Sequence, residues 1–355
     1  MKRIIALMLA AFILFPLAAC GGQQNEKGEG ASDSSFAEIS STPASTDALT
    51  PASSPALIDE AGIEYPYTFT DSLGGKVTLD KKPERVAVLF SSYADIWVTA
   101  GGSTAITVGE SVERGFADSS AVLVDSNAGH MTIDLETLTE AKPDLVIGTA
   151  DFECQAEAVE FCREAGIPAA AFKIEKFEDY LEVLKIFCTL TGETERYTIY
   201  GEQVKERIDS LKAAVSEYIN ENGINTNILF VRSGSSAKSA KAKTADDNFA
   251  CAMLEELGAR NIAETKSSLT GELSLEVILE ANPDYLFITT MGDENAAKDY
   301  MNSLLSSDGW NELDCVSEEN YCYLPKELFH FKPNASWAEA YEYLAKVLYP
   351  ELEFE

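Results

Sequence analysis

Continuous apolar runs alternate with helix-like patterns from residue 65 onward. Four of these runs are strand-like, at residues 85–90, 144–148, 227–232 and 284–290 (RVAVLF, DLVIG, NILFVR and DYLFITT). Such runs are typical of parallel strands that are covered by helices on both faces. The pattern therefore predicts an α/β fold.

One helix–turn–strand segment occurs twice. Asp134–Ala150 and Ser274–Thr290 lie 140 residues apart and share seven of seventeen residues, whereas unrelated segments would share about one. In each copy, apolar residues at helical spacing precede Pro143 or Pro283, and a strand-like run follows. The repeat predicts two similar lobes with parallel sheets.

A single amphipathic helix is expected between the lobes. From Glu195 to Asn220 the apolar positions step by three and four, with no proline. At 1.5 Å per residue this helix would be about 39 Å long, enough to run along both lobes as a stiff strut. We therefore expect an N-terminal lobe at 65–193, a connecting helix at 194–222 and a C-terminal lobe at 223–355, with a ligand cleft between the lobes.

The N-terminus has the pattern of an export signal. Lys2 and Arg3 precede an apolar run, residues 4–19, that is shorter than the ~20 residues of a bilayer-spanning helix. The run ends in Leu-Ala-Ala-Cys20, which resembles the lipobox of bacterial lipoproteins. We expect a signal peptide at 1–19 and a lipid on Cys20, which would anchor the protein on the outer face of the cell membrane. The alternative is an ordinary signal peptide with a chance cysteine.

Composition narrows the class further. Residues 20–64 are rich in Ser, Ala, Thr, Gly and Pro, which predicts a disordered tether. The net charge of −32 argues against a nucleic-acid partner and is consistent with solubility alone. None of the cysteines after Cys20 forms a C-x-x-C pair, and buried free thiols are the preferred interpretation. The spacing does not decide whether Cys315 pairs with Cys322 or Cys154 with Cys162. If one helix carries Cys154 and Cys162, their sulfur atoms are too far apart for a disulfide.

These features together resemble the helical-backbone class of ABC-importer substrate-binding proteins, which serve uptake of iron–siderophores, haem and cobalamin. The resemblance covers about residues 65–350. It rests on KPERVAVL at Lys82–Leu89, on the repeated Leu-Glu and Pro-Asp segment, and on the run Leu324–Pro350. It implies a monomeric lipoprotein that captures a ferric complex, most simply a siderophore-type chelate, and delivers it to a permease dimer. No covalent cofactor is expected beyond the lipid at Cys20.

The resemblance also explains why the segment occurs twice. In this family one glutamate per lobe docks onto an arginine pocket of each permease subunit, and Glu136 and Glu276 occupy that place in the two copies. A dimeric permease offers two equivalent sockets, and carboxylate–guanidinium pairs are strong and oriented. The alternative is that both are solvated helix residues retained from a duplication.

Candidate ligand contacts follow the strand-like runs. Ser92 and Asp95 form a capping box that would begin a helix and place Tyr93 in the cleft. After the first C-terminal strand a basic cluster, which Lys332 could extend, would attract an anionic ligand; its members are Arg232, Lys238, Lys241 and Lys243. A solvated charged loop is the alternative.

The chain has two histidines, His130 and His330, and the resemblance places both in cleft loops. Haem-binding relatives carry an axial ligand in the loop of His130 and Met131. An imidazole or thioether from each lobe could therefore ligate a haem iron. Surface or hydrogen-bonded histidines are the alternative.

Other functions fit the sequence less well. An enzyme is not expected, because neither G-x-S-x-G nor H-E-x-x-H is present. Bare zinc or manganese would require a compact set of histidine and carboxylate ligands. A cobalamin carrier and a surface scaffold or sensor remain as alternatives.

Overall fold

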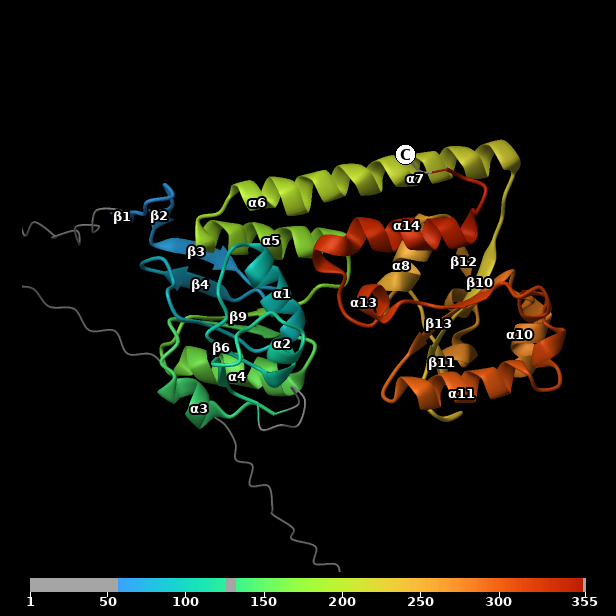
Figure 1. Ribbon diagram of the computed structural model, residues 1–355, viewed down its shortest axis with the longest axis horizontal. Coiled ribbons are helices and arrows are strands. Elements are labelled where there is room, and N and C mark those ends of the chain that lie inside the picture. Colours follow the sequence, from blue (N-terminus) through green and yellow to red (C-terminus); the bar gives the residue numbers. More distant parts are fainter. Residues whose placement is uncertain (1–56, 126–131, 354–355) are drawn as a thin grey trace, which may run out of the picture. The chain divides into compact units, whose positions relative to one another are not determined.

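The structure is a computed structural model of the 355-residue chain and describes residues 57–125 and 132–353. Two five-stranded sheets form the centres of two lobes (Figure 1). In the N-terminal lobe the strand order is β7-β6-β5-β8-β9, and all neighbouring strands are parallel. These strands are β5 (Val86–Val88), β6 (Ile106–Thr107), β7 (Val122–Leu123), β8 (Leu145–Thr149) and β9 (Ala169–Phe172).

The sheet of the C-terminal lobe has the order β11-β10-β13-β14, and β12 also pairs with β10. Only the β10–β11 pair in this sheet is antiparallel. The strands are β10 (Asn227–Ser233), β11 (Lys241–Ala242), β12 (Arg260–Asn261), β13 (Tyr285–Thr290) and β14 (Tyr321–Tyr323). The predicted α/β fold with two similar lobes is therefore confirmed.

Helices cover both faces of each sheet. Those of the N-terminal lobe are α1 (Ser91–Thr99), α2 (Gly109–Glu113), α3 (Leu135–Glu140), α4 (Glu153–Glu164) and α5 (Phe177–Thr191). Those of the C-terminal lobe are α8 (Phe249–Glu256), α9 (Ile262–Thr265), α10 (Leu275–Ala281), α11 (Glu294–Leu305), α12 (Asp314–Ser317), α13 (Lys326–Phe329) and α14 (Trp337–Leu348). Two antiparallel hairpins precede them: β1 (Leu57–Ile58) with β2 (Glu64–Tyr65), and β3 (Tyr67–Thr70) with β4 (Lys76–Leu79). The expected disordered tether at 20–64 is therefore wrong for residues 57–64, which form the first hairpin.

The repeated segment forms the same unit in both lobes, helix α3 with strand β8 and helix α10 with strand β13. After each helix the backbone takes a left-handed residue, Lys142 with φ 52° or Asn282 with φ 38°. The prolines at 143 and 283 follow directly and prevent the helix from continuing. The predicted helix–turn–strand unit is thus present twice.

The connecting helix begins at Glu195 and ends at Asn222. It consists of α6 (Glu195–Tyr197), a π-helical turn at Thr198–Glu202 and α7 (Gln203–Asn222). Its α7 face buries Val204, Ile208, Leu211 and Val215, which lie on the predicted apolar stripe. The helix passes over α5 of the N-terminal lobe and α14 of the C-terminal lobe (Figure 1).

The π-helical turn lies where the helix meets α5. A side chain at Gly201 would begin 3.2 Å from Leu181 of α5, so glycine allows the close approach. The phenol of Tyr180 on α5 donates a 3.0 Å hydrogen bond to the carbonyl of Tyr200. The apolar stripe did not predict the turn, because it continues on either side.

One buried core runs through both lobes and the connecting helix. Trp337 lies at its centre and is 1% exposed. Its ring centroid is 5.9 Å from that of Phe177 in the N-terminal lobe and 5.6 Å from that of Phe249 in the C-terminal lobe. The two lobes therefore share a core, and each sheet has a second core on its outer face.

We expect Trp337→Ala to lower the free energy of unfolding by about 3–5 kcal/mol, because it removes the ring that both lobes pack against. Urea unfolding followed by circular dichroism would measure this loss. Trp337→Phe, which keeps an aromatic ring, should cost less. Two separate unfolding transitions in the unsubstituted protein would contradict a shared core.

All six cysteines in the described residues have free thiols, and four of them are buried. This agrees with the interpretation made from their spacing. None of the helices in the described part of the chain combines the length and the apolar character of a membrane span.

Candidate functional site

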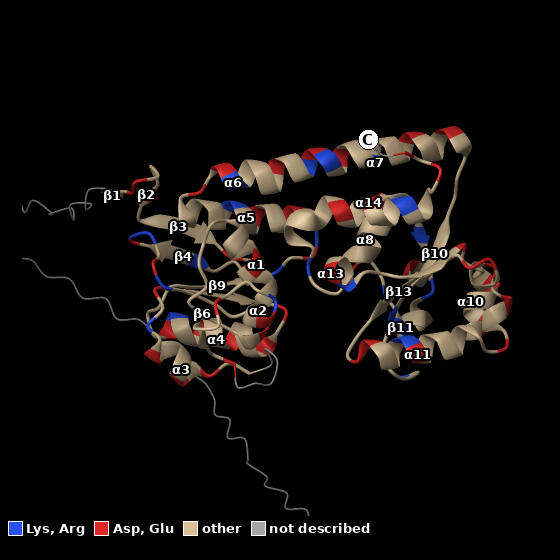
Figure 2. Cartoon of the chain, in the orientation of Figure 1, with Lys and Arg blue, Asp and Glu red and all other residues tan. Residues whose placement is uncertain are grey.

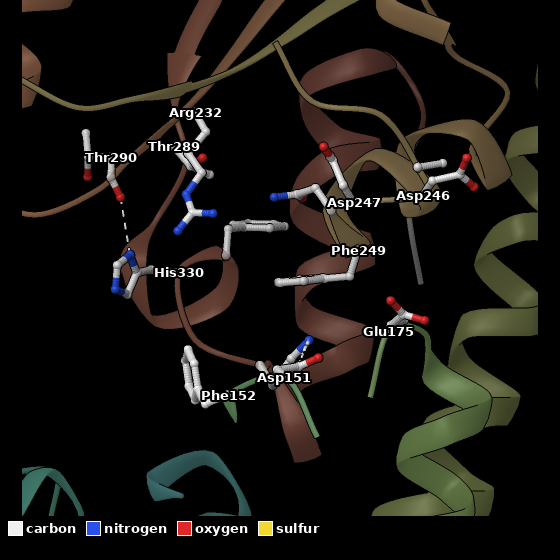
Figure 3. Close-up of a pocket in the computed structure, with 14 residues that line it drawn as sticks. Asp151, Phe152, Glu175, Arg232, Asp246, Asp247, Phe249, Thr289, Thr290 and His330 are labelled. Carbon is white, nitrogen blue, oxygen red and sulfur yellow. Dashed lines mark hydrogen bonds and ion pairs between the residues drawn. The ribbon is translucent and has the colours of Figure 1, made fainter. Parts of the chain in front are cut away.

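A pocket of about 320 Å³ lies between the two lobes (Figure 3). The N-terminal lobe contributes Asp151, Phe152 and Glu175 to its lining. The C-terminal lobe contributes Arg232, Ala245, Asp246, Asp247, Asn248, Phe249, Thr289, Thr290, Phe329, His330 and Lys332. The pocket is therefore built mainly by the C-terminal lobe.

The pocket residues lie at the carboxyl ends of parallel strands, where α/β proteins place their ligands. Asp151 and Phe152 follow β8, and Glu175 follows β9. Arg232 lies near the end of β10 and Thr289 near the end of β13. The cleft expected between the lobes is thus present at the expected edge of both sheets.

Arg232 is half-buried, and Figure 3 shows its guanidinium group pointing into the pocket. Its side chain forms no hydrogen bond or ion pair with any residue of 57–125 or 132–353. Burial lowers the pKa of its side chain, and the nearby carboxylate of Asp247 acts in the opposite direction. A partly desolvated guanidinium without a partner attracts an anion.

His330 lies beside Arg232 in the pocket. Its Nδ1 is 3.2 Å from the carbonyl oxygen of Thr290, so Nδ1 carries the proton and Nε2 keeps a free lone pair. The residue is exposed as a whole, but the ring packs edge-on against Phe331 with 4.9 Å between centroids. Burial of the ring lowers its pKa, the hydrogen bond with Thr290 opposes that shift, and the charges of Lys326 and Arg232 add to it. A neutral imidazole of this kind can accept a hydrogen bond or bind a metal.

Lys332 follows His330 by two residues and joins the lobes. Its ammonium donates a hydrogen bond to the carbonyl of Ile174 and lies 4.0 Å from the carboxylate of Asp151, both in the N-terminal lobe. Burial lowers its pKa, and Asp151 opposes that shift. Unlike Arg232, Lys332 is already paired.

Asn334 makes a second connection between the lobes. It is fully buried, and its amide donates hydrogen bonds to the Ser92 carbonyl at 2.9 Å and to the Asp95 carboxylate at 2.8 Å. The predicted capping box is therefore wrong. Helix α1 begins at Ser91 after Phe90, with no side-chain cap. Asp95 binds the other lobe instead.

Tyr93 is not a pocket residue, contrary to the prediction. It is 0% exposed and packs in the core against Phe90 and Phe172, with ring centroids 5.1 and 6.3 Å away. Its hydroxyl lies 3.4 Å from Oγ1 of Thr149. Helix α1 begins two residues earlier than the capping box predicts, and the side chain of Tyr93 lies in the core instead of the cleft.

The predicted basic cluster does not lie together in the pocket. Lys238 and Lys241 are exposed and outside the lining, and Lys243 forms an ion pair with Asp247 at 3.2 Å. Lys241 on β11 is the register partner of Arg232 on β10, but its side chain is exposed and does not line the pocket. Arg232 alone of the four reaches the pocket. His130, Met131 and Cys20 lie outside the described residues.

Glu136 and Glu276 are both exposed on the first turns of α3 and α10. Neither has an ion-pair partner in the described ranges. Figure 2 shows acidic residues on both helices. The carboxylates are thus available to a partner, one on each lobe.

Sequence reasoning misses several pocket residues: Asp151, Phe152, Glu175, Asp246, Asp247, Phe249, Thr289 and Phe329. The repeated segment indicates where three of these residues lie. Asp151 and Phe152 directly follow the first copy, and Thr289 is the last residue but one of the second. Examining each position at or just after a predicted parallel strand would have found these three.

Two α/β lobes, one long connecting helix and a pocket at the strand ends between the lobes define a two-lobed binding protein. The chain belongs to the periplasmic binding protein family, which it matches over residues 86–328. The match confirms the class that the sequence motifs resemble.

Two named relatives share less than a quarter of their aligned residues with this chain. The molybdate-binding protein MolA of Haemophilus influenzae is 23% identical over 235 residues, 62% of this chain and 65% of that protein. The iron-uptake system-binding protein of Bacillus subtilis is 22% identical over 192 residues, 54% of this chain and 57% of that protein. The aligned region thus spans less than two thirds of either relative.

A solved structure has the same fold. Staphylococcus aureus SirA complexed with staphyloferrin B superposes with a TM-score of 0.60 and 17% identity, covering 81% of this chain and 99% of that chain. At this identity the likeness shows the fold alone.

Proposed function

We propose that the protein captures an anionic metal complex outside the cytoplasm and delivers it unchanged to an ABC permease. The observation that carries this proposal is Arg232, a half-buried guanidinium that points into the interlobe pocket without a partner among the described residues. Leaving such a group unpaired is costly, and an anionic ligand would remove that cost. Family membership supports a binding role without catalysis.

The ligand that we propose first is a ferric chelate of the siderophore type. One relative is named for iron uptake, another for molybdate, and the solved SirA structure contains staphyloferrin B. Molybdate is an oxyanion, so an anionic ligand is compatible with these names. The aromatic rings of Phe152, Phe249 and Phe329 supply apolar contact area beside Arg232.

Haem is the second candidate, and His330 is the observation that favours it. Its Nε2 is free, and the residue lies in the pocket. In this case His330 would bind the iron of the incoming haem, and Arg232 would bind a propionate. His130 and Met131 stay candidates for the second axial ligand from the N-terminal lobe.

The partners follow from the same proposal. A lipid on Cys20 and a tether that ends before the β1–β2 hairpin would keep a monomeric body near the membrane. Glu136 and Glu276 would then dock onto the two permease subunits. Cobalamin remains a ligand to be tested.

Titration of the purified protein tests the proposal. Haem, a ferric hydroxamate, a ferric catecholate, ferric citrate and molybdate are added in turn, and visible absorbance and tryptophan fluorescence are followed. We expect saturable binding of at least one of them. A Soret shift that disappears in His330→Ala would identify haem as ligand, whereas quenching by ferric chelates alone would leave His330 incidental. A protein that responds to none of these compounds would contradict the proposed function.

A further inference from the structure

The repeat places a threonine at the same position in both lobes. Thr149 in β8 and Thr289 in β13 are identical residues of the two aligned segments. Both are buried, with exposures of 0% and 5%. Their hydrogen bonding differs, however, and this difference indicates a separate role for Thr289.

The hydroxyl of Thr149 is fully used within the N-terminal lobe. Its Oγ1 accepts a hydrogen bond from the backbone N–H of Asp151 at 3.1 Å. It also lies 3.3 Å from the carbonyl of Phe172 and 3.4 Å from the hydroxyl of Tyr93. Thr149 therefore has a structural role, and it does not line the pocket.

The hydroxyl of Thr289 has no hydrogen-bond partner among the described residues, although the residue is buried and lines the pocket. A buried hydroxyl without a partner is unfavourable, and such groups are rare in folded proteins. The C-terminal copy of the repeat thus keeps the threonine hydroxyl, but no described residue of its lobe forms a hydrogen bond with it.

Arg232 lies directly beside Thr289. The two residues are register partners in the parallel pair of β10 and β13, so their side chains lie on the same face of the sheet. In the N-terminal lobe the last paired residues of β5 and β8 are Val88 and Ile147. Two residues further along both strands, Phe90 lies opposite Thr149. The arginine therefore occurs in the C-terminal lobe only, next to the unsatisfied threonine.

The N-terminus of α8 also faces this wall of the pocket. Asn248 caps the helix by accepting from the N–H of Ala250 at 2.9 Å, and both Asn248 and Phe249 line the pocket. The helix dipole favours negative charge here. Two acidic residues precede the helix, but Asp247 is paired with Lys243 and Asp246 is exposed on the rim.

We propose that Thr289 and Arg232 form a single anion subsite, contained in the C-terminal lobe, for a carboxylate or similar oxyanion group of the ligand. This inference rests on the proposed function and makes Thr289 a specificity-determining residue. The guanidinium supplies the charge, and the Thr289 hydroxyl donates a hydrogen bond that fixes the position of the anion. The ligand would thus bind with its anionic group toward the C-terminal lobe.

The experiment compares Thr289→Val with Thr149→Val, the matched residue of the other lobe. Ferric citrate and molybdate are the two probes, because one offers carboxylates and the other an inorganic oxyanion. We expect Thr289→Val to weaken binding of the preferred probe about ten- to a hundredfold, the value of one hydrogen bond to a charged group. Thr289→Ser, which keeps the hydroxyl, should bind like the unsubstituted protein.

Thermal unfolding without ligand gives a second readout. Thr289→Val should keep its Tm or raise it by about 2 °C, because the valine removes an unsatisfied buried group. Thr149→Val should lower Tm while binding of the probe is retained. If Thr149→Val does not fold, Thr149→Ser replaces it as the control.

A double-mutant cycle tests whether the two residues act on one group. Arg232→Gln and Thr289→Val together should weaken binding less than the product of the single effects, because both contact the same anion. Unchanged affinity in Thr289→Val, or fully independent effects, would overturn the subsite. The subsite would also be overturned if the unsubstituted protein bound neither ferric citrate nor molybdate. The proposed function fails only if haem and the other ferric chelates also give no response.

Discussion

Replacing Glu136 and Glu276 together by alanine is expected to abolish uptake by whole cells while the purified protein keeps its affinity for the transported compound. Each glutamate would form a pair with an arginine of the permease, and truncating one partner of a buried charge pair costs about 2–5 kcal/mol. Loss of both pairs would therefore weaken docking more than a thousandfold. Uptake of radioactive iron and titration of the purified variant measure the two properties separately.

Glu140 and Glu280 provide a matched control. They occupy the same helices, correspond to each other in the repeat and are also exposed. The variant Glu140→Ala with Glu280→Ala should retain uptake, although Glu280 loses a 3.8 Å ion pair with Lys266. Equal loss of uptake in both double variants, or loss of ligand affinity in the first, would refute the specific docking role of Glu136 and Glu276.

Arg232→Gln is expected to lower affinity for an anionic ferric chelate about a hundredfold. The guanidinium has no partner in the described residues, so removing it does not break a pair within the protein. Two charge-assisted hydrogen bonds to the ligand, each worth about 1.5 kcal/mol or more, account for the expected loss. Titration with ferric citrate, followed by fluorescence, measures it.

Lys238→Gln is the control for net charge, because it removes the same charge from an exposed position outside the pocket. Its affinity should match that of the unsubstituted protein. Raising the salt concentration should weaken binding of the unsubstituted protein more than that of Arg232→Gln. Similar affinities in the two variants would show that the anion does not bind at Arg232.

Much of the fold was predictable because it depends on long patterns. The apolar runs at 227–232 and 284–290 become β10 and β13 with little change at their ends. The connecting helix expected at 194–222 begins at Glu195 and ends at Asn222. Burial of a whole face determines these elements, so single residues matter little.

The site was less predictable because it depends on single positions. Tyr93 lies in the core, and α1 begins two residues earlier than the capping pattern indicates. Lys241 pairs with Arg232 across β10 and β11 but stays exposed outside the pocket lining, which no property of the basic cluster reveals. Thr289 resembles an ordinary strand residue in the sequence, and only the absence of a partner for its hydroxyl in the described structure distinguishes it from Thr149.

Helix α14 follows both sheets in the chain, and Trp337 at its start lies between Phe177 and Phe249. The N-terminal lobe therefore lacks part of its core until residue 337 has been synthesised. A protein that works beyond the cytoplasmic membrane must usually cross it unfolded, and an unfinished core prevents early folding of the first lobe. The shared core thus makes folding of the first lobe depend on a residue that follows the second sheet, so we expect the N-terminal lobe alone to be less stable than the whole body.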